Sequence, residues 1–231
     1  MKKVNAIILS AGKGKRMNSD VSKQYLEIND KPIIYYTLKS FEKSNVDEII
    51  IVVGKGDVEY VKKEIVDKYN ISKITNIVEG GEERYDSVIN GLEYLNDEDL
   101  VLIHDGARPL IKIEEINKII DVVKKSGACI AGMPSKDTIK IINKEGVVVS
   151  TPERKNVWQI QTPQAFGVEI IKLAYKKMRE ADDKTITDDA MVIEKYTDTK
   201  IKVIETSYEN IKVTTPEDLI FVERIIESRK K

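Results

Sequence analysis

The sequence predicts an α/β protein with a mostly parallel twisted sheet and helices on both faces. Short apolar runs recur along the 231 residues, separated by segments with apolar residues at i, i+3 and i+4. The runs are continuously apolar, which is typical of parallel strands buried on both faces. Regular alternation of strands and helices indicates a Rossmann-like arrangement. In such sheets ligands bind beyond the carboxyl ends of the strands.

The predicted elements follow one another along the chain. An apolar run predicts the first strand at 6–9, and similar runs predict strands at 49–53, 75–78, 100–104 and 128–133. Helical spacing of apolar residues predicts helices at 58–69, 85–95 and 113–123. The second half predicts helices at 167–179 and 188–196, a strand at 200–204, a β segment at 211–213, and a helix from Pro216.

The alternation of strands and helices is interrupted at Lys136. Residues 138–142 and 147–150 predict two strands joined by a four-residue loop. Their apolar residues have no obvious helix to cover them, so we expect a projecting β-arm over 137–155 that packs against a second subunit. The alternative, a hairpin folded onto its own sheet, stays open. We expect one domain over 1–231, working as a homodimer.

Composition excludes several classes of protein. Lys and Arg total 38 against 39 acidic residues, so no basic field predicts nucleic-acid binding. No apolar run approaches the ~20 residues of a membrane span, and no signal peptide is predicted. One histidine, His104, and one cysteine, Cys129, argue against a His/Cys zinc site. A single cysteine fits a cytoplasmic protein.

The first strand leads into a glycine-containing loop. Gly12 and Gly14 allow backbone conformations in which successive backbone N–H groups face one anion. Arg16 and Lys23 are among the cations beside them, so the loop suits a triphosphate. The dinucleotide fingerprint and the P-loop spacing are both absent. A surface turn with solvated lysines is the alternative.

Two more polar clusters follow predicted strands. Residues 80–81 are paired glycines, and 105–108 begin with Asp105. Both clusters fall at the same edge of the sheet as the glycine loop, because the carboxyl ends of parallel strands share an edge. The sequence therefore predicts a site at this edge.

Taken together, the motifs resemble the 2-C-methyl-D-erythritol 4-phosphate cytidylyltransferase family of the non-mevalonate isoprenoid pathway. The matching segments are Ala11-Gly-Lys-Gly-Lys-Arg-Met17, Lys23-Gln-Tyr25, Gly80-Gly81 with Arg84 and Ser87, His104-Asp-Gly-Ala-Arg-Pro109, Asp137-Thr138, Arg154, Trp158, Gln161-Thr-Pro-Gln164, Thr187-Asp188, and Asn210-Ile-Lys-Val-Thr-Thr-Pro-Glu-Asp-Leu219. They span nearly the whole chain in order. Ser22, Glu82 and Gly106 depart from the family's usual residues.

The resemblance implies that CTP and a phosphorylated polyol form a CDP-alcohol and pyrophosphate. The attacking phosphate is already an anion, so positioning and electrostatics should dominate over base catalysis. The family's catalytic cations match Arg16, Lys23 and Lys212. Its nucleotide-binding positions match Ala11, Gly12, Gly14, Gly80, Gly81, Ser87 and Asp105. Its acceptor-binding positions match Asp105, Thr138, Arg154, Thr162 and Thr187. Mg²⁺ is the implied cofactor, with Asp105 as its candidate ligand.

Several of these residues also have ordinary structural interpretations. Lys23 and Lys212 could be surface lysines, and Asp105 could make a turn bond. Thr187 is a good helix N-cap. His104 is expected to be a core histidine. The roles of Arg84 and Arg108 stay open.

Three other functions compete with the predicted one. The nearest is a ribitol- or ribulose-5-phosphate cytidylyltransferase, which shares the glycine loop and the His-Asp motif. A pyrophosphorylase that uses UTP or GTP and a non-catalytic nucleotide-binding regulator are more distant. Trp158, the run from His104 to Pro109 and the segment from Asn210 to Asp218 favour the methylerythritol enzyme.

Overall fold

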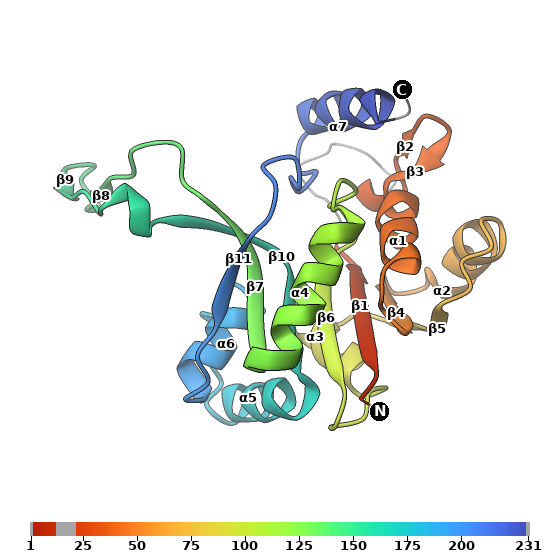
Figure 1. Ribbon diagram of the computed structural model, residues 1–231, viewed down its shortest axis with the longest axis horizontal. Coiled ribbons are helices and arrows are strands. Elements are labelled where there is room, and N and C mark those ends of the chain that lie inside the picture. Colours follow the sequence, from red (N-terminus) through yellow and green to blue (C-terminus); the bar gives the residue numbers. More distant parts are fainter. Residues whose placement is uncertain (1, 13–21, 230–231) are drawn as a thin grey trace.

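The computed structural model describes residues 2–12 and 22–229 (Figure 1). A seven-stranded sheet has the order β11-β7-β10-β6-β1-β4-β5. Its strands are β1 (Val4–Ser10), β4 (Glu48–Val53), β5 (Ile74–Glu79), β6 (Leu100–Asp105), β7 (Ala128–Pro134), β10 (Trp158–Gly167) and β11 (Lys202–Glu205). β10 runs antiparallel to both of its neighbours, and the other pairs are parallel. The mostly parallel α/β sheet is confirmed.

Helices cover both faces of this sheet. They are α1 (Ile33–Lys43), α2 (Val58–Val61) with its π-helical continuation η3 (Lys62–Asp67), α3 (Arg84–Leu92), α4 (Ile113–Ser126), α5 (Val168–Glu180) and α6 (Asp189–Tyr196). Helix α7 (Pro216–Ser228) packs outside this sheet. Short pieces are η2 (Lys23–Tyr25), β2 (Glu27–Ile28), β3 (Lys31–Pro32) and η4 (Arg154–Asn156). Among the described residues, no helix has the length and hydropathy needed to cross a membrane.

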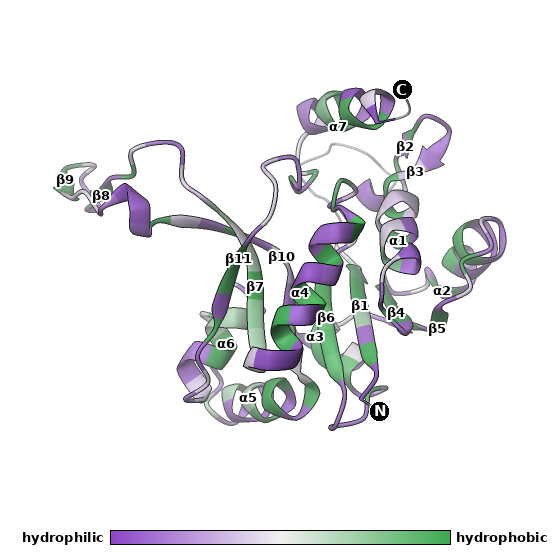
Figure 2. Ribbon diagram, viewed as in Figure 1, coloured by the Kyte–Doolittle hydropathy of each residue, from purple (hydrophilic) through white to green (hydrophobic). Residues whose placement is uncertain are grey.

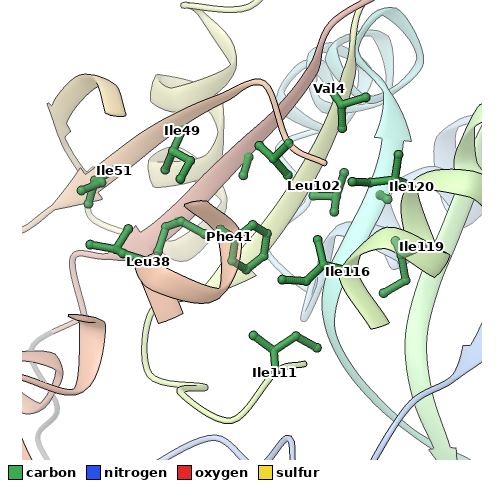
Figure 3. Packing of buried hydrophobic residues seen from close by; sticks show 14 of the residues in the cluster. Val4, Leu38, Phe41, Ile49, Ile51, Leu102, Ile111, Ile116, Ile119 and Ile120 are labelled. Atoms are coloured by element: carbon green, nitrogen blue, oxygen red, sulfur yellow. The ribbon is translucent and has the colours of Figure 1, made fainter. Parts of the chain in front are cut away.

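The core forms two main layers, one on each side of the sheet. On one side, Phe41 of α1 and Ile116 of α4 pack with Leu102 of β6 (Figure 3). On the other side, α3, α5 and α6 pack on the alternate side chains of the same strands, for example Ile103. Burial of a large apolar side chain stabilises the fold by roughly 1.5–3 kcal/mol. A third, smaller cluster lies under α7, where Val222 packs with Val213.

Helix α4 illustrates why these segments form helices. Its buried residues Ile116, Ile119, Ile120 and Val123 lie on one face, as the i, i+3, i+4 spacing predicts. The Lys112 N–H donates to the Glu115 carboxylate at the amino end. Gly127 ends the helix with φ at 75°, a conformation that favours glycine.

Strand β10 is the main element that the sequence prediction missed. It contains Gln161, Thr162 and Gln164, which interrupt the apolar pattern of a central strand. All three are buried, and the Gln164 amide donates to Asp188 while the Gln161 amide donates to the Ser207 carbonyl. These partners lie in distant segments, so local sequence does not reveal them. Helix α1 was also missed, and the predicted β segment at 211–213 is irregular.

The predicted hairpin forms a separate two-stranded sheet. β8 (Ile141–Ile142) and β9 (Val148–Ser150) pair antiparallel and are shorter than predicted. Figures 1 and 2 show this arm extending away from the central sheet, with apolar residues at its tip. Val147 and Val149 are 60% and 65% exposed. The projecting position is confirmed, and the alternative of a hairpin folded onto its own sheet is wrong.

Candidate functional site

A cleft lies at the carboxyl ends of β1 and β6. It is lined by Leu9, Ser10, Ala11, Gly12, Lys23, Gln24, Gly81, Glu82, Glu83, Arg84, Ser87, Asp105, Ala107 and Lys212. The three polar clusters predicted to share this edge therefore meet there, joined by Lys212 from the far end of the chain. Gly14 and Arg16, two of the predicted site residues, lie outside the described residues.

Asp105, the last residue of β6, is surrounded by positive side chains. Its Oδ2 atom lies 3.0 Å from Lys212 Nζ and 3.4 Å from Arg108 Nε, and its Oδ1 atom lies 3.7 Å from Arg84 Nε. Its backbone N–H donates to Thr162 Oγ1 at 3.1 Å. Burial alone raises the pKa of a carboxyl group, but the three cations outweigh it and hold the pKa of Asp105 well below its ordinary value. Asp105 is therefore a fixed negative charge.

Two lysines from opposite ends of the chain meet at this cleft. Lys23 is held by η2, whose neighbouring residues Gln24 and Tyr25 are buried. Its ammonium donates to the carbonyl of Val213 at 2.9 Å, next to Lys212. Val213 is itself fixed, because its N–H donates to the Ala107 carbonyl at 2.8 Å. The cleft thus brings together ammonium groups from distant segments, which can bind phosphate oxygens.

The paired glycines form a tight turn between β5 and α3. A Cβ on Gly80 would lie 2.5 Å from the Cβ of Ala11, and one on Gly81 would lie 2.2 Å from the Cβ of Asp86. Only glycine permits these approaches. The Ser87 hydroxyl accepts the Gly81 N–H at 3.1 Å and so holds the turn closed. The turn precedes α3, so these glycines do not cap a helix C-terminus.

Arg84, whose role was left open, connects two helices and reaches the cleft. Its guanidinium donates to both oxygens of Asp189 at 2.9 and 2.7 Å, which joins the start of α3 to the start of α6. The hydroxyl of Tyr175 also donates to Asp189. Burial lowers the pKa of a guanidinium, but Asp189 reverses this and raises the pKa of Arg84. Asp189 was not predicted from the sequence, in which its only signal is its place after the helix-capping Asp188.

Arg108 also connects structural elements. Its Nη1 atom donates to the carbonyl of Asn210 at 2.8 Å, while its Nε atom faces Asp105. It is not among the residues that line the cleft. Arg108 therefore joins the loop after β6 to the segment that precedes Lys212.

His104 is fully buried below the cleft, as predicted for a core histidine. Its Nδ1 atom lies 3.0 Å from Thr162 Oγ1, and its Nε2 atom lies 3.3 Å from the Arg108 carbonyl. A carbonyl only accepts, so Nε2 carries the proton and Nδ1 accepts from the Thr162 hydroxyl. Burial lowers the pKa of His104 to about 3, so the ring is neutral. Thr162 in turn supports the Asp105 backbone.

Because His104 is buried and neutral, we expect the folded protein to lose stability in acid. The unfolded chain binds a proton near pH 6.5 whereas the folded chain does so only near about 3, so stability is lost as pH falls between these values. From pH 7 to pH 5 we expect this group to lower the unfolding free energy by about 2 kcal/mol. Urea unfolding at both pH values measures the effect, and His104→Gln should remove it. An equal pH dependence in the variant would contradict this assignment.

The predicted acceptor residues are distributed more widely. Thr138 and Arg154 are exposed near the arm and do not line the cleft of their own chain. Thr187 is exposed and lines a neighbouring cavity with Glu83 and Arg84. The alternative that Thr187 caps α6 is wrong, because Asp188 is the N-cap and its carboxylate accepts the Met191 N–H at 2.9 Å.

The described side chains at the cleft offer few ligands for a metal ion. Across residues 2–12 and 22–229, no three His, Cys, Asp or Glu side chains are arranged to hold one. Asp105 offers one oxygen, Oδ1, whose contact with Arg84 is longer than those made by Oδ2. Such a donor set fits Mg²⁺ that takes most of its ligands from phosphate oxygens and water.

Comparison with known proteins gives a consistent result. A family model described as 2-C-methyl-D-erythritol 4-phosphate cytidylyltransferase matches residues 4–228. A protein of that name from Lachnoclostridium phytofermentans is 53% identical over 226 residues, covering 98% of this chain and 97% of its own length. Another, from Alkaliphilus oremlandii, is 50% identical, covering 99% of this chain and 97% of its own length.

Solved structures agree with the sequence matches. The crystal structure of 4-diphosphocytidyl-2C-methyl-D-erythritol synthase from Anaerococcus prevotii superposes with a TM-score of 0.86 at 38% identity, covering 98% of this chain and 96% of that one. The Francisella tularensis cytidylyltransferase gives 0.79 at 29% identity, covering 96% and 99%. The similarity therefore includes the central sheet, the cleft and the arm.

Proposed function

The chain belongs to the 2-C-methyl-D-erythritol 4-phosphate cytidylyltransferase family, and from this premise we propose how its residues perform that reaction. The enzyme joins CTP and 2-C-methyl-D-erythritol 4-phosphate to give 4-diphosphocytidyl-2-C-methyl-D-erythritol and pyrophosphate, a step of isoprenoid biosynthesis. Its relatives at 53% and 50% identity favour this acceptor over ribitol or ribulose 5-phosphate. The observation that supports the site is the meeting of Lys23, Arg84 and Lys212 around one cleft.

The cations of the cleft stabilise the transition state. The acceptor phosphate attacks the α-phosphorus of CTP, its P–O bond forms as the bond to pyrophosphate breaks, and no proton must be removed first. The backbone N–H groups of Ala11 and Gly12 face the triphosphate, and Lys23 neutralises its oxygens. Gly14 and Arg16, which lie outside the described residues, are proposed for the same two roles from the family resemblance alone. Lys212 lies beside the reacting phosphates. Fixed charges at these positions need no rearrangement as charge develops.

The glycine turn receives the nucleoside. Gly80 and Gly81 present the backbone groups of a tight turn to the cleft and its adjoining cavity, and Ser87 keeps this turn in place. A second cavity adjoins the cleft at this turn, and its lining includes Gly12 and Gly80. This continuity supports cytosine at the turn and phosphates at the lysines.

Asp105 orients the acceptor and a divalent cation. Its fixed carboxylate suits the hydroxyls of the polyol, and its Oδ1 atom is the proposed protein ligand of Mg²⁺. When bound, Mg²⁺ would draw charge from the phosphate oxygens. Thr187, which lines a neighbouring cavity, is proposed to contact the acceptor, and Thr162 is proposed to act through the Asp105 backbone that its hydroxyl holds. The buried, unbridged Cys129 supports the further proposal of a cytoplasmic enzyme.

The arm is proposed to complete the site of a second subunit. Its exposed apolar residues need a partner, and Thr138 and Arg154 do not line the cleft of their own chain. An isologous dimer would bring each arm to the other subunit's cleft. The arginine fork of Arg154 suits the acceptor phosphate.

Mixing two inactive variants tests this sharing. Lys23→Ala disables a subunit's own cleft, and Arg154→Ala disables the arm that it lends. In a mixed dimer one of the two sites has both residues intact, so random mixing should restore about a quarter of wild-type activity. Pyrophosphate release after refolding the variants together measures it. No recovery, or an active monomer by light scattering, would contradict a shared site.

A coupled pyrophosphate-release assay tests the reaction itself. CTP with 2-C-methyl-D-erythritol 4-phosphate and Mg²⁺ should release pyrophosphate, whereas UTP, GTP and the ribitol and ribulose phosphates should not. Omission of Mg²⁺ should suppress release. Equal rates with ribitol 5-phosphate would transfer the assignment to the rival enzyme, and no release with any pair would support a regulator.

A further inference from the structure

Lys212 reaches the cleft on a segment without regular structure. We call residues 206–214, between β11 and α7, the strap. A lysine ammonium stands on a flexible four-carbon stem. A shift of the backbone at Lys212 therefore changes which positions its ammonium can reach. The contacts that fix the strap therefore decide where Lys212 lies relative to Asp105.

Asn210 ties the strap to the interior. Its side chain is fully buried, and its amide nitrogen donates to Gln161 Oε1 at 3.0 Å and to the Thr162 carbonyl at 2.9 Å. Its own carbonyl accepts from Arg108 at 2.8 Å. The same residue thus contacts β10 through its side chain and the loop after β6 through its backbone.

Thr162 connects Asn210 with Asp105. The Thr162 carbonyl accepts from the Asn210 amide, and its hydroxyl accepts the Asp105 N–H at 3.1 Å. Thr162 therefore holds the backbone of Asp105 directly, and it holds the backbone near Lys212 through Asn210. A shift of the strap also moves the Val213 carbonyl that holds Lys23.

The burial of Asn210 is costly in free energy. Its Oδ1 atom is buried without a hydrogen-bond partner among the described residues. An unpaired buried polar atom costs about 1–3 kcal/mol, which an apolar side chain would avoid. Packing alone therefore does not explain why an amide side chain occupies this buried position.

We propose that Asn210 is a positioning residue that sets the ammonium groups of Lys212 and Lys23 in the cleft. The proposal rests on the proposed function of these two lysines. Asn210 itself does not line the cleft and touches no reacting atom. Its contribution passes through the strap, so its loss should appear in turnover more than in CTP affinity.

A double-mutant cycle tests this coupling. Asn210→Ala should lower kcat between about 10-fold and about 100-fold, as expected for misplaced catalytic groups. In a Lys212→Ala background the same change should lower kcat by a clearly smaller factor, because one of the two groups that it positions is already absent. Equal fold-losses in the two backgrounds would overturn the proposal.

Asn5 offers a matched control. It is also buried, its amide donates to the Leu100 carbonyl, and its Oδ1 atom has no hydrogen-bond partner within the part of the chain that the structure describes. It lies at the amino end of β1, at the opposite edge of the sheet. Asn5→Ala should lower thermal stability as Asn210→Ala does and leave kcat within about 2-fold of wild type. A fall in kcat as large as that of Asn210→Ala would assign both effects to stability.

Hydrogen exchange tests the attachment of the strap by Asn210 independently of enzyme activity. Peptides covering 206–214 should exchange faster in Asn210→Ala than in wild type or Asn5→Ala, with the core strands unchanged. If Asn210→Ala does not fold, Gln161→Met removes one acceptor of the same amide and should give smaller changes of the same kind. Unchanged exchange of the strap would overturn the proposal. Faster exchange in a chain whose wild type transfers no cytidylyl group would instead locate the failure in the proposed function.

Discussion

Lys23→Ala is expected to lower turnover about 100-fold or more, which is the loss seen when one preorganised oxyanion donor is removed. The ammonium lies at the cleft and is held by the Val213 carbonyl at 2.9 Å. Its charge is therefore in place before charge develops on the pyrophosphate. Steady-state pyrophosphate release with saturating CTP and acceptor measures the effect.

Two controls separate this role from folding and from total charge. Lys63→Ala removes a lysine whose side chain is 84% exposed, and it should leave turnover unchanged. Lys23→Arg keeps the charge but changes its shape, and it should recover part of the lost rate. A folded Lys23→Ala enzyme with near-normal turnover would remove Lys23 from the mechanism.

Arg84→Met is expected to lower the unfolding free energy by about 3 kcal/mol, because it leaves the buried carboxylate of Asp189 without its charged partner, whose own side chain is 30% exposed. Asp189 is fully buried, and both of its oxygens accept from Arg84. Without the guanidinium, the carboxylate keeps the Tyr175 hydroxyl but loses its neutralising charge. Urea unfolding at pH 7 measures the loss.

A double variant tests whether the unpaired carboxylate causes this loss. Arg84→Met with Asp189→Leu replaces the pair by apolar side chains and should recover most of the stability. It should not recover turnover, because Arg84 also lines the cleft and faces Asp105. If the double variant were less stable than Arg84→Met, the explanation by an unpaired buried charge would be wrong.

Local pattern was sufficient for most of the sheet. Apolar runs such as 49–53, which lies within β4, predicted strands because parallel strands are buried on both faces. The local sequence pattern did not predict β10, because Gln161 and Gln164 have their hydrogen-bond partners in distant segments. Burial of these amides depends on tertiary contacts that no window of sequence contains.

The same division applies to the site. Sheet-edge reasoning placed Gly12, Gly81 and Asp105 together, since all three follow predicted strands. Lys212 was assigned only by resemblance, because nothing in its irregular strap indicates that it crosses to the cleft. Asp189 was missed because its contact with Arg84 joins residues 105 positions apart. No spacing rule connects two helix starts at that separation.

A crystal structure with CTP and Mg²⁺ bound tests the central claim most directly. The triphosphate should lie in the cleft between the backbone after β1 and Lys23, with its α-phosphate facing Lys212 and its cytosine at Gly80 and Gly81. CTP found at another surface, with the cleft open to solvent, would contradict the account.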